Sequence, residues 1–306
     1  MEIIWGIDKI SSSSPSAVTI GTFDGVHRGH KKIISELLKK AGQKGLCSTL
    51  ITFDLHPRTV IKSGKQISLI TAIEEKLELL KQTGLERVLV IHFDKKFSQI
   101  HYKDFVKDVL IDKLNMKACV IGYDHSFGKN REGNFSSLGP LSRQYGFSLD
   151  QVDPYEADGQ LINSTIIRQF LADGDVALAG RLLGQTFSIS GHVVHGSERG
   201  RSLSYPTANL EPLHPRKVRP GNGVYAVDVE YNGAIYKGMA NIGFKPTFEE
   251  LDAPAVEVHI FDFNKSIYGE NINVFFKKRL RSEKKFDSSE DLIAQLEIDK
   301  EESLKI

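Results

Sequence analysis

The chain has 306 residues, more than a single hydrophobic core usually supports, and its length therefore predicts two domains. Hydrophobic content of 40% and charged content of 26% are those of an ordinary globular protein and exclude wholesale disorder. Forty basic against thirty-nine acidic residues exclude a global electrostatic footprint for nucleic acid or an anionic membrane, so any phosphate binding must be local.

The sequence shows no pattern for secretion or membrane insertion. The first residues, MEIIWGIDKISSSSPSAV, include acids and no long apolar core, and no run of about 18 apolar residues occurs elsewhere. The two cysteines, Cys47 and Cys119, lie in apolar runs that predict buried strands, which suits a reduced compartment better than a disulfide framework. We expect a cytoplasmic protein with no nucleic-acid, membrane or obligate protein partner.

Between Ala17 and about Asp153, short β-branched runs alternate with longer helical stretches. The strand-like runs are SAVTIGTF, LCSTLITF, RVLVIHF and KACVIGY, and the helical ones are HKKIISELLKKAGQKG, TAIEEKLELLKQTG and HYKDFVKDVLIDKLN. Such alternation predicts βαβ units and a doubly wound parallel sheet with helices on both faces. Gly42, Gly45 and Gly84 fall at the expected ends of helices. In such sheets ligands bind beyond the carboxyl ends of the strands.

The first candidate site follows the first of these strands, in the string GTFDGVHRGH. A glycine-rich turn from strand to helix brings backbone N–H groups and the positive helix end close to a phosphate. His27 and His30, three residues apart, would share a face and hydrogen-bond transferring phosphoryl oxygens. The alternative is a pair of surface histidines beside a tight turn. The candidate phosphate- and nucleotide-binding residues here are Gly21, Phe23, Asp24, Gly25 and Gly29.

Two features of this first half stay open. Asp24 either braces the loop or holds a metal ion or a ribose hydroxyl. In INSTIIRQF, Ser164 and Thr165 would cap a helix that carries Arg168 one turn on, so that hydroxyls, N–H groups and a guanidinium converge on a triphosphate. The plainer alternative for this segment is an ordinary cap and a solvated arginine.

After LAGRLLG the pattern changes to short strands punctuated by turns. The runs are FSISGHVVHG, NGVYAVDVEYNGAIYKGMANIG, AVEVHIFDF and INVFFKKRL. We place the join near Gly184, which gives domains of residues 1–184 and 185–306. YNG predicts a hairpin with a type I′ turn. Residues 288–305, with Leu292, Ile293, Leu296 and Ile298, predict a closing amphipathic helix.

The second candidate site lies in GHVVHGSERGRSLSYPTANLE. A glycine-rich flap with Gly196, Gly200 and Arg201 would cover phosphates of ATP. Thr207 and Asn209 would supply oxygen ligands to Mg²⁺, or alternatively to Mn²⁺. Glu257 in AVEVHIFDF is the candidate base for an attacking hydroxyl. The alternatives are a basic hairpin, a simple turn at PTAN, and a glutamate that faces solvent.

Taken in order, these motifs resemble the bacterial bifunctional riboflavin kinase/FAD synthetase family, whose first half belongs to the HxGH nucleotidyltransferase superfamily. GTFDGVHRGH, ITFDLHPRTV, IGYDHSFGKNREGN and INSTIIRQFLADGD carry the resemblance in the first half. GxxxGRxxxxPTAN, NGVYA, NIGxxPT, VEVHxxDF and LRxExKF carry it in the second half. The resemblance implies an α/β nucleotidyltransferase domain followed by a small antiparallel β-barrel with a closing helix.

The same resemblance implies two reactions that use ATP as co-substrate: phosphorylation of riboflavin to FMN, and adenylylation of FMN to FAD with release of pyrophosphate. It implies that His56 lies by the first active site, that Ser164, Thr165 and Arg168 hold phosphate, and that Glu257 deprotonates the ribityl 5′-hydroxyl. The residues expected on the flavin side are Asp124, Phe127, Gly128, Arg131, Arg281 and Phe286. For Arg281 and Phe286 the alternative is a packed surface pair.

The chain also departs from the family pattern. The departures are Leu55, His125, Asn163, Ser204 and Arg219. His125 replaces a common Phe, and the loss of an aromatic wall would weaken flavin binding. Two other functions therefore stay open: an enzyme with only one of the two activities, with the adenylyltransferase half the one in question, or a flavin- or nucleotide-binding regulator without turnover.

Overall fold

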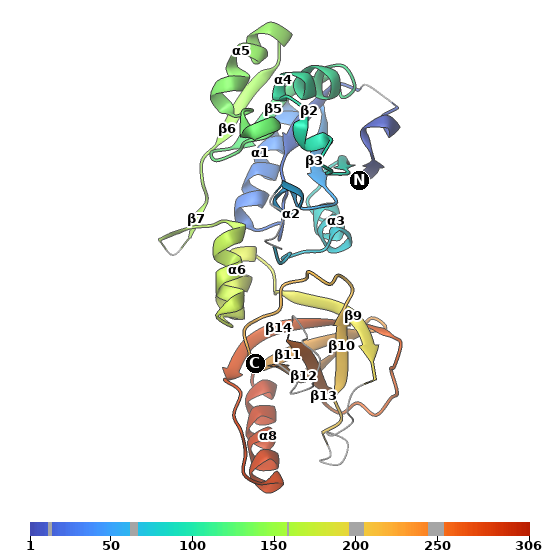
Figure 1. The fold of residues 1–306 in the computed structure, drawn as a ribbon, viewed down its shortest axis with the longest axis vertical. Coiled ribbons are helices and arrows are strands. Elements are labelled where there is room, and N and C mark those ends of the chain that lie inside the picture. The colour runs from blue at the N-terminus through green and yellow to red at the C-terminus, as the bar shows by residue number, and fades with distance from the viewer. Residues whose placement is uncertain (12–13, 62–66, 158, 196–204, 244–253) are drawn as a thin grey trace. The chain divides into compact units, whose positions relative to one another are not determined.

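The computed structural model describes residues 1–306 except 12–13, 62–66, 158, 196–204 and 244–253 (Figure 1). The chain divides into two compact units, Met1–Asn163 and Ser164–Ile306. This division groups residues by their contacts and does not identify where the fold of each domain begins. The domain boundary near Gly184 therefore stays a prediction. Helices α6 (Ser164–Ala172) and α7 (Val176–Leu183) fall in the second unit of this division.

The first unit is built on a six-stranded sheet in the order β1-β4-β3-β2-β5-β6, and every neighbouring pair is parallel. The predicted doubly wound sheet is confirmed. The strands are β1 (Glu2–Trp5), β2 (Ser16–Ile20), β3 (Cys47–Phe53), β4 (Arg87–Ile91), β5 (Met116–Gly122) and β6 (Ser148–Val152). The edge strands β1 and β6 were not predicted, because one is very short and the other is largely polar.

Helices cover both faces of this sheet, with a hydrophobic core on each side. The helices are α1 (Arg28–Lys44), α2 (Pro57–Ile61), α3 (Ile73–Lys81), α4 (Tyr102–Asp104), the π-helical η3 (Phe105–Ile111) and α5 (Phe135–Tyr145). Buried residues of α1 and α3 share one core, and those of η3 and α5 share the other. A two-stranded ladder, β7 (Glu156–Ala157) with β8 (Gln160–Leu161), follows β6.

The glycine assignments for helix ends were only partly right. Gly45 ends α1 in the left-handed conformation, with φ of 60°. Gly42 lies inside α1, where an added Cβ would meet nothing within 4 Å, so the prediction that it ends the helix was wrong. An exposed glycine is tolerated within a helix when packing on the other face holds the turns together.

The order of the strands places the candidate loop at the centre of the sheet. From β2 the chain adds β3 and β4 on one side, and then crosses to add β5 and β6 on the other. The point where the direction reverses lies between β2 and β5, and ligands bind beyond the carboxyl ends of strands at such a point. The loop at residues 21–27 leaves β2 at this place.

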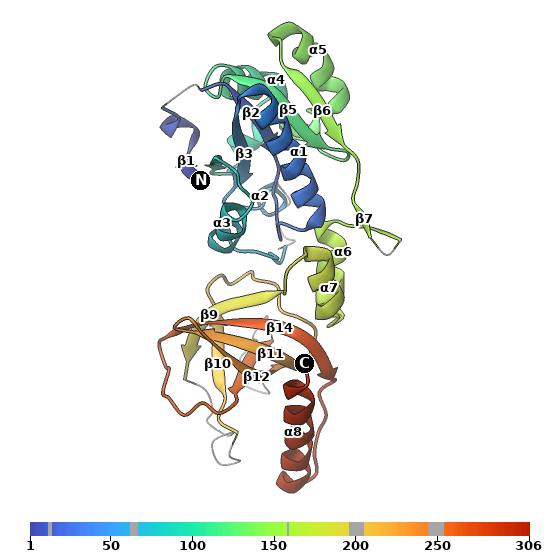
Figure 2. The same ribbon diagram turned by 180° about the vertical axis from the view of Figure 1, so that it is seen from behind.

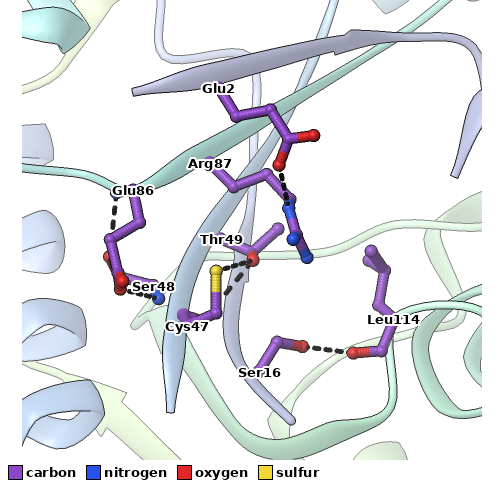
Figure 3. Close-up of polar contacts among 8 residues, drawn as sticks. All are labelled: Glu2, Ser16, Cys47, Ser48, Thr49, Glu86, Arg87 and Leu114. Carbon is purple, nitrogen blue, oxygen red and sulfur yellow. Dashed lines mark hydrogen bonds and ion pairs between the residues drawn. The ribbon is translucent and has the colours of Figure 1, made fainter. Parts of the chain in front are cut away.

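The amino ends of the strands, by contrast, are joined by polar contacts (Figure 3). Glu2 accepts from Arg87 Nε at 2.9 Å, which ties β1 to β4. Glu86 accepts from the Ser48 backbone N–H at 2.8 Å and from its hydroxyl at 3.0 Å. Ser16 donates to the Leu114 carbonyl at 2.6 Å. These contacts satisfy polar groups that the sheet would otherwise leave unpaired at this edge.

The second unit contains a closed antiparallel barrel in the order β10-β13-β12-β11-β14-β9, as predicted. Its strands are β9 (Ser188–Val194), β10 (Ala208–Pro212), β11 (Gly223–Tyr231), β12 (Ala234–Gly243), β13 (Ala255–Ile260) and β14 (Asn271–Arg281). The predicted hairpin is confirmed: Tyr231 pairs with Ala234, and Asn232 and Gly233 have φ of 50° and 77°. Helix α7 packs beside β14 (Figure 2).

The closing helix exists as α8 (Ser289–Leu304), but its buried face is the predicted one only in part: Leu292 and Leu296 are half-buried, and Leu296 packs against a small core cluster. Ile293 and Ile298 are 36% and 51% exposed, whereas Asp299 is only 2% exposed. The reason is an ion pair, since Arg281 donates from Nε and Nη2 to the Asp299 carboxylate at 2.7–3.0 Å. A buried carboxylate is tolerated when it is paired in this way. In the described part of the chain, no helix has the length and apolar character needed to cross a membrane.

Replacing Arg281 by Met should destabilise the second unit, because Asp299 would remain as a buried carboxylate without its partner. We expect a loss of about 3–5 kcal/mol in the free energy of unfolding, measured by urea denaturation. The double variant Arg281→Met/Asp299→Leu should recover most of this loss, since both charges are gone. Lys278→Met removes an exposed charge from the same strand and is the control. Equal stability of the two single variants would contradict a structural role for this pair.

Candidate active sites

The loop after β2 has an unusual backbone. Phe23 and Val26 have φ of 48° and 41°, in the left-handed region that costs a residue with a Cβ free energy. Gly25 between them has φ of 85°. The side chains of Phe23 and Val26 are buried in the core beside α1, and this packing holds the strained turn. Strain fixed by surrounding structure is typical of functional sites.

Asp24 anchors this loop to the segment before α3. The residue is 3% exposed, and its carboxylate accepts hydrogen bonds from the backbone N–H groups of Ile70 at 3.2 Å and Thr71 at 2.9 Å. The Thr71 hydroxyl donates to the same carboxylate at 3.2 Å and accepts from the Gly25 N–H at 2.9 Å. This geometry is that of a brace, and nucleotide binding by Asp24 stays a prediction.

The two histidines lie together, as their spacing predicted. His27 caps α1, with its Nδ1 accepting from the His30 backbone N–H at 3.3 Å. Their rings stack with centroids 3.6 Å apart and 19° between the planes. Gly29 leaves room for this stack, since an added Cβ would lie 3.2 Å from the His27 ring.

The environment keeps His30 neutral. Burial, then the proximity of His27, then that of Lys76 hold the pKa of His30 well below its usual 6.5. Its Nδ1 is buried and has no hydrogen-bond partner among the described residues. A neutral imidazole with an unsatisfied ring nitrogen at a helix N-terminus is available to hydrogen-bond a ligand.

A pocket opens beside this loop at the carboxyl ends of β2 and β3. It is lined by Thr22, Asp24, Phe53, Asp54, Leu55, His56, Leu69, Thr71, Ile73 and Lys76. The pocket therefore brings His56 into the neighbourhood of the β2 loop. His56 Nδ1 accepts from the Arg58 backbone N–H at 3.2 Å, at the start of α2. Leu55, one of the departures, adds an apolar wall to the pocket and removes no reacting group.

Lys76 is a charged residue of this pocket that sequence reasoning did not identify. Its Nζ donates to the Thr22 carbonyl at 3.1 Å, the Thr52 hydroxyl at 2.9 Å and the Phe53 carbonyl at 3.0 Å. Burial lowers the pKa of Lys76 to about 8, against the opposing effects of nearby Asp24 and Asp54. A signal was present in the sequence, because a lysine here interrupts the apolar face of α3 that includes Leu77 and Leu80.

The loop around Phe127 is tightly closed. Phe127 and Gly133 exchange backbone hydrogen bonds at 2.8 and 2.9 Å, and the Phe127 ring packs against Phe105 in the core. Gly128 has φ of 74°, and an added Cβ would lie 2.8 Å from Cβ of Tyr102. Arg131 is exposed and donates from Nε to the Ser126 hydroxyl at 2.6 Å. Flavin contacts by Asp124, Phe127, Gly128 and Arg131 stay predictions.

The departure at His125 has a structural account. Its ring stacks beside that of Phe127, with centroids 5.6 Å apart and 30° between the planes. Burial, and secondarily the charge of Arg131, lower the pKa of His125 to about 4, so the ring is neutral at physiological pH. An aromatic ring thus lies beside Phe127 despite the departure, at the cost of a buried Nε2 with no partner among the described residues, and the effect of His125 on flavin binding stays a prediction.

The segment with Ser164, Thr165 and Arg168 opens the second unit. Helix α6 begins at Ser164, directly after Asn163, which is one of the departures from the family pattern. Arg168 follows one turn on. The predicted helix is confirmed. Convergence of these groups with the histidine pair on one triphosphate stays a prediction.

In the barrel, the register of three strands lines up the candidate base with two amides. Glu257 of β13 pairs with Asn209 of β10 on one side and with Asn241 of β12 on the other. Directly paired residues point to the same face of a sheet. Since Val256 and Val258 are buried inside the barrel, these three side chains lie on its outer face. Sequence reasoning did not single out Asn241, because only the register connects it to Glu257.

The predicted metal-binding segment is held from two sides. His259 Nδ1 donates to the Pro206 carbonyl at 2.8 Å, and the Tyr205 hydroxyl donates to Glu297 of α8. Thr207, which comes next, lies two residues before Asn209 and would share its face. A hydroxyl and an amide are oxygen donors, which fit a hard cation such as Mg²⁺. Within the described ranges, no group of three or more His, Cys, Asp or Glu residues is placed to hold a metal ion.

The remaining predicted site residues are those of the glycine-rich flap and the pair Arg281 and Phe286. Gly196, Gly200, Arg201 and the departure Ser204 lie outside the described residues. The Arg281 guanidinium lies 5.7 Å from the centroid of the Phe286 ring, while its N–H groups bond Asp299 and the Ser282 carbonyl. This matches the packed pair that was the alternative interpretation, and flavin binding by Arg281 and Phe286 stays a prediction. The departure Arg219 is partly buried, and burial lowers its pKa.

A doubly wound sheet with paired histidines at its switch point defines the class of the first unit as a nucleotidyltransferase-like α/β domain, here followed by a closed β-barrel. Two family models match the chain, FAD synthetase over residues 9–166 and riboflavin kinase over residues 183–306.

Curated relatives match nearly the whole chain. A bifunctional riboflavin kinase/FMN adenylyltransferase from Bacillus subtilis is 39% identical over 95% of this chain and 92% of its own length. The protein of the same name from Escherichia coli K12 is 38% identical over 97% and 95%. A solved structure described as a macrolide-efflux protein from Streptococcus pneumoniae is 34% identical, with a TM-score of 0.90 and full coverage of both chains. The chain belongs to the bifunctional riboflavin kinase/FMN adenylyltransferase family, enzymes of flavin cofactor biosynthesis.

Replacing His125 by Phe should flatten the dependence of stability on pH. In the folded protein the pKa of His125 is about 4, below the 6.5 of the unfolded chain, so the unfolded chain binds the proton first. Wild-type stability should therefore decrease as pH falls from about 6.5 towards 4, with His30 contributing in the same direction. We expect a smaller decrease for His125→Phe in urea unfolding at pH 7, 5.5 and 4.5. Identical slopes would contradict the burial of a neutral ring.

Proposed function

We propose that this chain makes both flavin cofactors, with ATP as the co-substrate of each step. The second unit phosphorylates riboflavin to FMN, and the HxGH site of the first unit transfers an adenylyl group to FMN to give FAD. The observation that carries the proposal is the alignment of Glu257 with Asn209 across β10 and β13, on a chain that also carries the stacked histidine pair. A binding protein without turnover would need neither a base nor such a pair.

In the kinase step, Glu257 accepts the proton of the ribityl 5′-hydroxyl as its oxygen attacks the γ-phosphorus of ATP. The bond from the γ-phosphorus to the bridging oxygen breaks, and ADP leaves. Thr207 and Asn209 would hold Mg²⁺, or Mn²⁺ in its place, which when bound neutralises charge on the phosphates. Asn241 is aligned with Glu257 on the other side, where its side chain would share the face of the barrel that carries the base.

In the adenylyl-transfer step, a phosphate oxygen of FMN attacks the α-phosphorus of ATP, the bond to the β-phosphate oxygen breaks, and pyrophosphate leaves. The His27 and His30 imidazoles and the N-terminus of α1 stabilise the charge on the phosphoryl oxygens. His30 is neutral in the free protein, so one of its ring nitrogens carries an N–H that can donate to a phosphoryl oxygen. Ser164, Thr165 and Arg168 would bind the triphosphate.

The proposal includes the substrates and the compartment. Riboflavin, FMN, FAD and ATP are the ligands, and no protein, nucleic-acid or membrane partner is required for either step. The cytoplasm is the proposed location, and the free thiols of Cys47 and Cys119 support it. The main alternative is an enzyme in which only the kinase step occurs, and this alternative is less favoured because His125 retains the aromatic stacking of the flavin loop.

The test is chromatographic separation of flavins after incubation of the full chain with Mg-ATP and either riboflavin or FMN. The wild type should give FAD from both substrates. Glu257→Gln should form FAD from FMN at the normal rate and lose about 10²–10⁴-fold in the riboflavin step, because it lacks the base. Glu270→Gln, at an exposed turn of the same unit, is the control.

Each other result of this assay points to a different function. FMN as the sole product from riboflavin would restrict the function to the kinase. No product from either flavin would contradict an enzymatic function.

A further inference from the structure

We propose that Lys76 is a positioning residue for adenylyl transfer, whose side chain joins the loops after β2 and β3 and so holds the floor of the first active site. This role presupposes the adenylyl transfer proposed above. It concerns a residue that no motif of the HxGH site contains, since Lys76 lies on α3, well after the histidine turn in the chain.

The hydrogen bonds of Lys76 reach both strands that end at the site. Its Nζ donates to the carbonyl of Thr22, the residue before the strained turn, and to the carbonyl of Phe53, the residue before the segment that leads to His56. It also donates to the Thr52 hydroxyl, which itself donates to the Thr22 carbonyl at 3.1 Å. One ammonium therefore fixes the ends of β2 and β3 relative to each other.

These bonds require the charged form of the side chain. Three acceptors surround Nζ, and an ammonium has three N–H donors, whereas a neutral amine has only two. The side chain is 6% exposed and lines the pocket, so solvent contributes little to satisfying it. Loss of the proton would remove one of the three hydrogen bonds that Nζ donates.

The charged and titratable groups near Lys76 come from the loops and helix of the site. Asp24 in the loop after β2 and Asp54 in the loop after β3 favour its charge and oppose the effect of burial. On α1, the pKa of His30 depends in part on Lys76, because the Lys76 charge is one of the causes that lower it. Glu75, its neighbour on α3, accepts a hydrogen bond from the Ala72 N–H at the start of the helix.

A purely structural role explains this arrangement less well. An apolar side chain of similar length would fill the same space without the free-energy cost of removing a charge from water. The ammonium instead supplies two effects that the site uses: fixed spacing of the two loops, and a positive charge that adds to burial and to His27 in lowering the pKa of His30.

The test compares Lys76→Met with Lys81→Met in the full chain. Lys81 is an exposed lysine of the same helix, paired with Glu78, and serves as the matched control. For Lys76→Met we expect kcat for FMN adenylylation to fall about 10- to 100-fold, because small displacements of catalytic groups have effects of this size. The riboflavin kinase rate of the second unit should be unchanged and serves as an internal control for folding of that unit.

The pH dependence of the rate separates positioning from simple stability. The pKa of Lys76 is about 8, so its proton is increasingly lost above that pH and the wild-type adenylylation rate should fall. Lys76→Arg keeps its charge at high pH and should lack this decrease, whatever its absolute rate. The kinase rate, measured in the same buffers, shows how far pH changes act through ATP, the substrate that the two reactions share. If Lys76→Met does not fold, this comparison with Lys76→Arg carries the test.

A second readout does not need turnover. In histidine NMR titrations, Lys76→Met should raise the pKa of His30 and shift the His27 and His30 resonances, whereas Lys81→Met should not. Wild-type rates in Lys76→Met, or unchanged histidine resonances, would overturn the positioning role. A wild type that phosphorylates riboflavin but makes no FAD from FMN would overturn the adenylyltransferase proposal instead, and the NMR comparison would then show separately whether Lys76 influences the histidine pair.

Discussion

The first active site depends on a strained turn that the surrounding core holds in place. Phe23 and Val26 both adopt the left-handed conformation, at a cost on the order of 1–3 kcal/mol each. Their side chains are buried, and Asp24 between them accepts hydrogen bonds from the segment before α3. Because these two buried side chains and the Asp24 carboxylate fix the turn, His27 reaches the cap position of α1 and stacks on His30.

In the barrel, strand register has the corresponding role. The Asn232–Gly233 turn sets the pairing of β11 with β12, and β12 in turn pairs with β13, so that Asn241 and Glu257 lie opposite each other. A slip of one residue would turn Glu257 towards the interior and Val256 outwards. The burial of Val256 and Val258 opposes this slip, and the apolar core thereby determines where the candidate base points.

Buried polar groups decide several positions that hydrophobic patterning alone would place differently. Asp299 is on the inner face of α8 because Arg281 pairs with it, which leaves Ile298 exposed. Lys76 is buried because two strand ends present it with carbonyl and hydroxyl acceptors. In both cases the partner is distant in sequence, so the local period of apolar residues carries no information about it.

The sequence by itself determined the family, the parallel sheet, the antiparallel barrel with its type I′ turn, and the pairing of His27 with His30. The parallel sheet, the turn and the histidine pair follow from patterns within short segments, because periodicity, turn residues and motif spacing are local properties of the chain. The barrel was implied by the family resemblance that the ordered motifs carry. Only the tertiary structure decided the burial of Lys76, the exposed face of α8, the alignment of Asn241 with Glu257, and the neutral stacking of His125. Each of these depends on atoms that folding brings together from separate elements, and a buried charge or amide takes the position where such partners satisfy it.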